Sequence, residues 1–365
     1  MTPFDVAGLA GAIALLASAL LPLAVRPLLV RLGIMDVPNE RSSHERPVLR
    51  GLGLSVLIAI GIAGVTAVTL LSAGSDRPPG WIMLVIVLAG SIAAGLLGLA
   101  EDLRGLSVSV RSVLLLALAF AAAFASLHFA PRGVAYAPAL DGGSASFAAV
   151  SGGVSFPLWA SLALMIYAVL FISSYINVAN FMDGLNGISG FHGVIAGLTF
   201  AAAGWMLGAV WLCAAGLVLA AGFAGFLPWN LTKPGAFLGD VGSYLLGGAV
   251  AITSFAALVA GVPLLATIGP MVIYFGDVAV TLVKRVRAGR RWDEPHKEHA
   301  YQRIQQLGYT HVQASGMAAA ATLATSLLGL GSLFTGVAGS LALFAAGLVV
   351  LVLYLLLPKL LPSRA

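Results

Sequence analysis

Charged residues and cysteine are both scarce in this chain of 365 residues. Only 9% of the residues are charged and 60% are hydrophobic, whereas soluble domains carry about 25% charged and roughly 45–50% apolar residues. Such a composition cannot cover a water-exposed surface. It excludes a soluble enzyme and a disordered chain, and it disfavours nucleic-acid binding despite a net charge of +5. The one cysteine, Cys213, lies in an apolar run, which excludes a disulfide framework and a thiolate metal cluster.

Long hydrophobic runs make up most of the sequence. A helix needs about 20 apolar residues to cross a hydrocarbon core about 30 Å thick, and eleven such runs are present. We therefore predict an all-α, multi-pass membrane protein with a single integral membrane domain over residues 1–365. The 44 glycines suit closely packed membrane helices. The predicted spans are 6–25, 52–74, 80–99, 110–130, 156–178, 187–204, 206–228, 241–260, 262–283, 312–333 and 338–357.

Basic residues cluster in alternate loops of this predicted topology. One set of loops holds 17 of the 19 Lys and Arg residues, and the other set holds only Arg77 and Arg132. The positive-inside rule then predicts an N-terminus outside and a C-terminus in the cytoplasm. Most acidic residues follow the basic ones, which predicts an active site on the cytoplasmic face. The predicted cytoplasmic loops are 26–51, 100–111, 179–187, 229–240 and 284–311.

The first and last of these loops are rich in arginine and histidine. Arg41, His44 and Arg50 lie in a non-helical, glycine-containing stretch, where they could hold phosphate oxygens through charge-assisted hydrogen bonds. In the last loop, seven basic residues accompany His296 and His299, a candidate clamp for a diphosphate. The two histidines could ligate zinc, but the oxygen-rich partners favour Mg²⁺. Both loops have an alternative interpretation as positively charged anchors that contact anionic lipid.

Adjacent carboxylates mark the second loop. Glu101 and Asp102 end a predicted helix and are followed by Arg104 and Arg111. Repulsion between two neighbouring carboxylates could raise the pKa of one of them and make it a proton acceptor. The pair could also help to bind a divalent cation. The alternative is a solvated helix end with Arg104 as a counter-charge.

Amide and carboxylate groups recur in the third loop. Asn177, Asn180 and Asp183 are spaced three residues apart, and Asn186 follows. Polar groups between two apolar helices are costly unless they are used, so these side chains could bind a nucleotide base, sugar hydroxyls or hydrated Mg²⁺. Helix capping is an alternative for Asp183 and Asn186, but it does not explain Asn177 and Asn180 together.

The fourth loop ends in Gly239-Asp240-Val-Gly242-Ser, which opens a predicted helix. Glycines on both sides of the aspartate allow a ligand to approach the backbone closely. The helix N-terminus favours an anion, either Asp240 itself or a phosphate. Asp240 could also be an ordinary N-cap residue. Together, the loops contain the groups needed for phosphoryl chemistry on an anionic substrate at a membrane surface.

In their order and spacing, these motifs resemble the polyprenyl-phosphate N-acetylhexosamine-1-phosphate transferases of glycosyltransferase family 4. The likeness spans residues 26–303 and depends mainly on Asn-x-x-Asn-x-x-Asp-Gly-x-x-Gly and Gly-Asp-x-Gly-Ser. It implies transfer of a sugar-1-phosphate from a UDP-sugar to undecaprenyl phosphate, with release of UMP, at the bacterial inner membrane. It also implies Mg²⁺ as the cofactor, with Mn²⁺ as a substitute, and a homodimer by analogy alone.

The resemblance further implies roles for single residues. Asp240 matches the family's Mg²⁺-coordinating aspartate. Glu101 and Asp102 match an Asp-Asp pair, which leaves open which of the two acts as the base. The implied candidates are Asp102, Glu101, Asp183, His296 and His299 for catalysis, Asn177, Asn180, Asn186, Arg41, His44, Arg50 and Arg303 for substrate binding, and Asp240 for the metal.

Departures from the family pattern narrow the choice of UDP-sugar substrate. Glu101 replaces the first aspartate of the pair, and Leu52 interrupts an expected Arg-Gly-Gly-Gly. His296-Lys-Glu-His299 lacks consecutive histidines, and Asn186 stands where the peptidoglycan enzyme has an aspartate. The last two features are closer to the O-antigen-type initiators, which favours a UDP-N-acetylhexosamine or a deoxy relative over UDP-N-acetylmuramoyl-pentapeptide.

Two other classes of protein fit the sequence less well. A transporter or lipid flippase requires ionisable residues deep within the bundle, and only Asp277 lies clearly inside a predicted span. The absence of a convincing internal repeat also weakens a transporter built from inverted halves. A non-catalytic membrane scaffold would not need the segment from Asn177 to Asp183.

Overall fold

The computed structural model describes residues 1–36, 48–73, 77–131, 134–137, 146–149, 158–232, 235–291, 294 and 296–364. Within these residues, eleven helical segments are long and apolar enough to cross a membrane, which confirms the predicted number. They are α1 (Pro3–Leu20), α3 (Gly53–Ala73), α4 (Trp81–Arg104), α5 (Val108–Phe129), α6 (Leu158–Met182), α7 (Ile188–Leu207), α8 (Val210–Leu231), α9 (Gly239–Val259), α10 (Leu264–Ile268) continued by α11 (Val272–Arg287), α13 (His311–Gly331) and α14 (Val337–Leu360).

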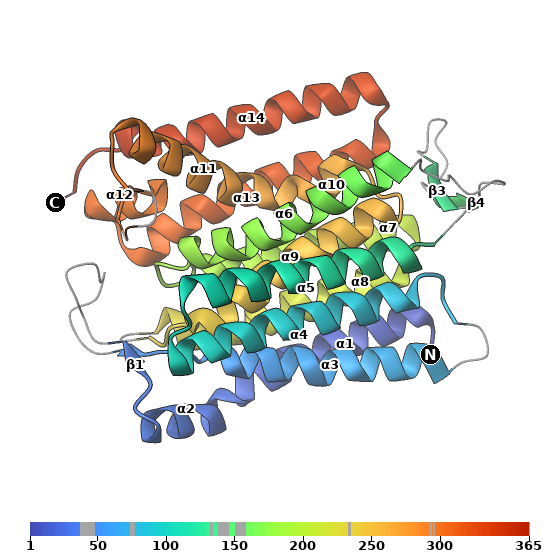
Figure 1. The fold of residues 1–365 in the computed structure, drawn as a ribbon, viewed down its shortest axis with the longest axis horizontal. Coiled ribbons are helices and arrows are strands. Elements are labelled where there is room, and N and C mark those ends of the chain that lie inside the picture. Colours follow the sequence, from blue (N-terminus) through green and yellow to red (C-terminus); the bar gives the residue numbers. More distant parts are fainter. Residues whose placement is uncertain are drawn as a thin grey trace.

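The remaining described elements lie at the two ends of the bundle (Figure 1). One end carries the C-terminus, α2 (Pro22–Arg31), α12 (Ala300–Gln306) and the antiparallel pair β1 (Met35–Asp36) and β2 (Val48–Leu49). The other carries the N-terminus and the antiparallel pair β3 (Val134–Ala137) and β4 (Ser146–Ala149). The termini lie at opposite ends, as an odd number of crossings requires. The spans on either side of the five loops predicted to be cytoplasmic end or begin on the side that holds the C-terminus (Figure 1).

Proline changes two of the predicted spans. The first was predicted over 6–25, but α1 ends at Leu20 and Pro22 opens the separate helix α2. In the ninth, a 3₁₀ turn, η1 (Gly269–Met271), interrupts the helix at Pro270 between α10 and α11. Both breaks follow from the missing N–H of proline and from its ring, which clashes with the preceding turn.

Helix α9 is the centre of the bundle: 94% of an 18-residue stretch of it is buried, compared with 11% of a stretch of the same length in α14. Glycines let its neighbours approach it. A Cβ atom on Gly98 of α4 would overlap with the carbonyl group of Asp240, and one on Gly53 of α3 would overlap with the carbonyl oxygen of Leu238. Close packing of small residues therefore brings the ends of α3 and α4 against the start of α9.

Candidate active site

Backbone hydrogen bonds hold the stretch before α3 against the stretch before α9. The N–H of Phe237 donates to the carbonyl of Leu49 (2.8 Å), the N–H of Leu52 to Phe237 (3.1 Å), and the N–H of Gly53 to Leu238 (2.9 Å). This pairing fixes the backbone on both sides of Arg50, so the arginine is carried to the first turn of α9.

Arg50 bridges two carboxylates that come from different helices. Its Nε lies 2.9 Å from Oδ1 of Asp102, in the last turn of α4, and its Nη2 lies 2.9 Å from Oδ2 of Asp240, in the first turn of α9. The second oxygen of Asp102 accepts a hydrogen bond from the N–H of Val241 (2.9 Å). Gly239 has a φ of +76°, and a Cβ there would lie 2.8 Å from Oδ2 of Asp102, so glycine serves both the backbone conformation and the close approach.

Two residues of the third loop join this cluster. Nδ2 of Asn180 donates to Oδ1 of Asp240 (2.8 Å) and to Oγ of Ser243 (3.0 Å). Asp183 follows α6 and accepts a hydrogen bond from Oγ of Ser189 (2.6 Å). Burial raises the pKa of Asp183 to about 7, and the negative charges of Asp240 and Asp102 act in the same direction. The structure therefore brings three aspartates and an amide to one end of the bundle.

The raised pKa of Asp183 predicts how stability depends on pH. Its folded-state pKa of about 7 exceeds the ordinary value of 3.8, so its contribution to stability is complete below about pH 4 and is lost as the pH rises through about 7. Asparagine mimics the protonated form at every pH. We expect the melting temperature of the wild type, minus that of Asp183→Asn, to fall between about pH 5 and about pH 8.

Melting curves of both proteins in detergent, without added metal, test this prediction. The pKa of His296 is lowered to about 4 by burial, which gives a pH dependence of the opposite sign. This dependence is common to both proteins and cancels in the difference. A difference that increases with pH would contradict the assignment.

Glu101 and Asn177 lie apart from the cluster. The carboxylate of Glu101 accepts a hydrogen bond from the N–H of Leu106 (3.0 Å) and pairs with Nη1 of Arg111 (3.3 Å), so it closes the corner between α4 and α5. The side-chain amide of Asn177 donates to the carbonyl of Ser173 in its own helix (2.9 Å). Of the Glu-Asp pair, the structure turns only Asp102 towards Asp240.

His299 fastens the helix α12 to the bundle. The histidine side chain is buried, and its Nδ1 lies 3.2 Å from Oδ1 of Asp277, which is itself fully buried. Both oxygens of Asp277 accept hydrogen bonds from the N–H of Ala300 (3.1 Å each), and Oδ2 also accepts one from the hydroxyl of Tyr354 in α14 (2.8 Å). His299 and Asp277 therefore hold α12 against the bundle. The contacts of Asp277 are those of an anchor for α12, not those of a residue that lines a transport path.

His296 and Arg303 are more accessible than His299. His296 is half-buried, its ring centroid lies 4.9 Å from that of His299, and its lowered pKa leaves it neutral near pH 7. Arg303 is half-buried on α12. The hydroxyl of Tyr301 donates to the carbonyl of Phe181 (3.1 Å), which ties α12 to the turn that carries Asp183. The segment that holds His296 and His299 therefore lies beside the turn between α6 and α7.

Three other residues were predicted to bind substrate, and the structure describes only one of them. Arg41 and His44 lie outside the described residues. Asn186 is half-buried in the turn between α6 and α7, and its backbone carbonyl accepts a hydrogen bond from Oγ of Ser315 (2.9 Å).

Asn230 is a buried polar residue that the sequence patterns did not indicate. Its Oδ1 accepts a hydrogen bond from the N–H of Gly187 (2.5 Å), and its Nδ2 donates to the carbonyl of Ala236 (2.9 Å). It thereby joins the α6–α7 turn to the segment before α9. The available signal was an amide just beyond the predicted span 206–228, in an otherwise apolar helix.

Loss of this clamp should be measurable. We expect Asn230→Ala to lower the free energy of unfolding by about 1–3 kcal/mol, because the N–H of Gly187 and the carbonyl of Ala236 would lose buried partners. Melting in detergent measures the effect. Thr66→Ala is a suitable control, because its exposed hydroxyl donates only to the carbonyl of Ile62 in its own helix. Equal melting temperatures for the two variants would contradict the role of Asn230.

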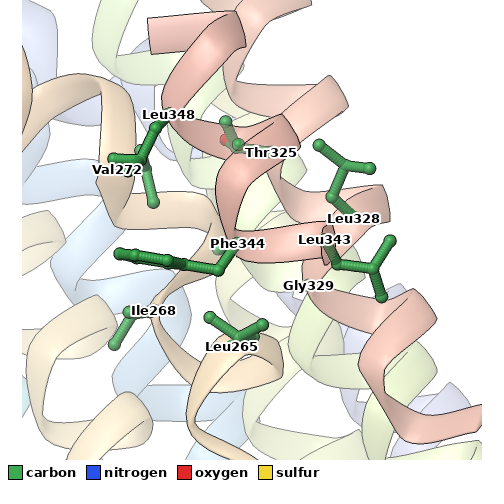
Figure 2. Close-up of a pocket in the computed structure, with 11 residues that line it drawn as sticks. Leu265, Ile268, Val272, Thr325, Leu328, Gly329, Leu343, Phe344 and Leu348 are labelled. Carbon is green, nitrogen blue, oxygen red and sulfur yellow. The ribbon is translucent and has the colours of Figure 1, made fainter. Parts of the chain in front are cut away.

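An apolar crevice lies elsewhere, between α14 and the helices α10, α11 and α13 (Figure 2). Phe344 points towards Leu265 and Ile268, and the other lining residues are also almost entirely apolar. Among the described residues, its lining includes no carboxylate, side-chain amide or arginine. Such a lining suits contact with hydrocarbon. Its apolar character distinguishes this crevice from the polar cluster at the start of α9.

Comparison with known proteins identifies relatives of this chain. The family model described as "Glycosyl transferase family 4" matches residues 84–258, which include Asp102, Asp183 and Asp240. A probable undecaprenyl-phosphate N-acetylglucosaminyl 1-phosphate transferase of Bacillus subtilis is 25% identical over 309 residues, 82% of this chain and 78% of that protein.

Two further relatives point the same way. A decaprenyl-phosphate N-acetylglucosaminephosphotransferase of Mycolicibacterium smegmatis is 27% identical over 318 residues, 80% of this chain and 73% of its own. A phospho-N-acetylmuramoyl-pentapeptide-transferase of Desulforudis audaxviator is 28% identical over 206 residues, 53% of this chain and 58% of its own. Residues 84–258, which contain the cluster of aspartates, therefore belong to glycosyl transferase family 4.

Proposed function

We propose that this protein transfers an N-acetylhexosamine-1-phosphate, or that of a deoxy relative, from a UDP-sugar to undecaprenyl phosphate and releases UMP. The observation that carries the proposal is the convergence of Asp102, Asp183 and Asp240 with Arg50 at one end of the bundle. The names of relatives that act on polyprenyl phosphates support the acceptor, and N-acetylglucosamine in two of those names supports the sugar class.

The position of the cluster suits a lipid acceptor. Asp102 and Asp240 lie in the terminal turns of two membrane-spanning helices, α4 and α9. A polyprenyl chain held in the bilayer would present its phosphate at this boundary. We place this end at the cytoplasmic face of the bacterial inner membrane on the basis of the basic loops. A homodimer belongs to the proposal by family analogy alone.

The donors at the site fit Mg²⁺, and Mn²⁺ would suit the same oxygens. Mg²⁺ is commonly bound by one or two carboxylates, with water and substrate phosphates completing the coordination. Asp102 and Asp240 supply two such carboxylates, and the hydrogen bond from Asn180 orients the second. No cluster of three or more His, Cys, Asp or Glu suited to a metal occurs among the described residues, so a bound ion would need water and substrate phosphates as further ligands. When bound, the ion would neutralise charge on the diphosphate.

The residues of the chain then have separate tasks. Asp102 accepts the proton of the acceptor phosphate or helps to place the metal ion. An acceptor oxygen attacks the sugar-bearing β-phosphorus, the bond from that phosphorus to the bridging oxygen breaks, and UMP leaves with the electron pair. Arg50 and Arg303 supply positive charge to the phosphates as negative charge accumulates. Neutral His296 can donate one hydrogen bond to the diphosphate.

A transporter or flippase receives no support from these findings. Asp277, the one acidic residue predicted inside a span, accepts hydrogen bonds from the chain itself, and the relatives are named as transferases.

UMP release tests the proposal directly. Purified protein in detergent is incubated with undecaprenyl phosphate, Mg²⁺ and a panel of UDP-N-acetylhexosamines. We expect release that requires both the lipid and the metal, and the best donor identifies the sugar. Folded protein that releases no UMP from any donor, beside an active control enzyme, would contradict the proposed reaction.

A further inference from the structure

We propose that Arg50 is an internal counter-ion of the Asp102–Asp240 pair, which a divalent cation displaces and which then binds the phosphate of the substrate. The inference rests on the proposed function for the presence of a metal ion and a phosphate. It goes further in assigning Arg50 two alternating partners, and therefore a competition between the arginine and the metal.

The geometry places the guanidinium group where a bridging cation would act. Two ionised carboxylates that face each other repel unless a positive charge lies between them. Arg50 supplies this charge through two different nitrogens, each 2.9 Å from one carboxylate. The two carboxylates that it pairs with, Asp102 and Asp240, are also the ones that would hold a hard cation, so the arginine and the cation would compete for them.

The surroundings allow the side chain to move while the backbone stays in place. The segment on both sides of Arg50 is held by the N–H of Phe237 to the carbonyl of Leu49 and by the N–H of Leu52 to the carbonyl of Phe237. The arginine side chain is 38% exposed, whereas that of Asp102 is 2% exposed. Asp102 is thus enclosed by protein, whereas the more exposed guanidinium group is the partner that would turn towards a phosphate from the aqueous side.

A competition of this kind has an unusual signature. If Arg50 and the metal exclude each other, loss of the arginine strengthens metal binding, because coupling between two ligands of one site is reciprocal. Transfer nevertheless becomes slower, because the phosphate loses its guanidinium partner. A merely structural role for Arg50 would instead weaken both metal binding and transfer.

Mn²⁺ binding to the full-length protein in detergent tests the inference. Free Mn²⁺ is measured by electron paramagnetic resonance at one fixed pH for all variants. We expect Arg50→Gln to bind Mn²⁺ at least about fivefold more tightly than the wild type, and to release UMP more slowly. Arg50→Lys should fall between them, since one ammonium group cannot bridge two carboxylates as a guanidinium does.

Arg111→Gln is the matched control. It removes the same charge from the neighbouring pair with Glu101, and its Mn²⁺ affinity should stay within about twofold of the wild type because charges farther from the site are screened. Unchanged or weaker Mn²⁺ binding by Arg50→Gln would overturn the inference. If Arg50→Gln does not fold, the same criterion applies to Arg50→Lys.

The inference and the proposed function fail in different ways. Tight Mn²⁺ binding by the wild type that does not change in the Arg50 variants refutes only the competition. Absence of Mn²⁺ binding in every variant, with UMP release that persists in a chelator, refutes both the metal and the competition. Absence of UMP release with the expected order of Mn²⁺ affinities refutes the reaction and leaves the competition standing.

Discussion

We expect Asp102→Asn to lower UMP release at least about 100-fold, a loss of the size seen when one preorganised electrostatic contact is removed from an active site. The substitution keeps the shape of the side chain, and its amide oxygen can still accept the hydrogen bond from the N–H of Val241. It removes one of the two negative charges that face Arg50. Proton acceptance and cation binding should both fail while the fold is retained.

Glu101→Gln is the control for this prediction, and it decides between the two adjacent carboxylates. Because Glu101 pairs with Arg111 and the N–H of Leu106 at the α4–α5 corner, we expect its substitution to change UMP release less than about tenfold. Initial rates of both variants, with saturating lipid and Mg²⁺, give the comparison. A larger loss in Glu101→Gln than in Asp102→Asn would reverse the assignment.

The second large effect concerns the contact between α4 and α9. We expect Gly98→Ala to destabilise the protein by about 3 kcal/mol, the upper end of the usual cost of overpacking, and to lower UMP release at least about tenfold. The added Cβ would overlap with the carbonyl group of Asp240. Backbone atoms cannot turn aside as a flexible side chain can, so the two helices must separate. Separation also moves Asp102 away from Asp240.

A glycine without close neighbours gives the matched control. A Cβ on Gly8, in α1, would meet nothing within 4 Å. Gly8→Ala should leave UMP release unchanged and raise stability by up to about 1 kcal/mol, since alanine is the better helix former. Melting temperatures and transfer rates of the two variants are compared in the same detergent. Similar behaviour of Gly98→Ala and Gly8→Ala would show that α4 and α9 do not need this close contact.

The sequence by itself determined the membrane architecture and the order of the polar motifs. The length of an apolar run is a local property, and a hydrocarbon core of about 30 Å requires about 20 such residues per crossing, so eleven runs became eleven spans. Because the motifs end or begin these spans, alternation of the helices already places them at one end of the bundle. The prolines at 22 and 270 are also local signals of helix breaks, although the two breaks that they cause were not predicted.

Only the tertiary structure decided which side chains meet. Adjacent residues on a helix point about 100° apart, so Glu101 and Asp102 cannot both face α9, and packing through Gly98 selects Asp102. The sequence pattern grouped His296 with His299, but the chain folds so that His299 is buried against Asp277, while His296 is half-buried.

Asn230 is a residue whose role could not be recognised from the sequence at all. A single amide at the end of an apolar helix carries no pattern, and its importance arises from the N–H of Gly187 and the carbonyl of Ala236, which it joins. These partners lie 43 residues before it and 6 residues after it. Hydrophobicity specifies how a chain crosses a membrane because it acts residue by residue. Direction and distance between side chains depend on contacts between helices, and these exist only once the bundle has packed.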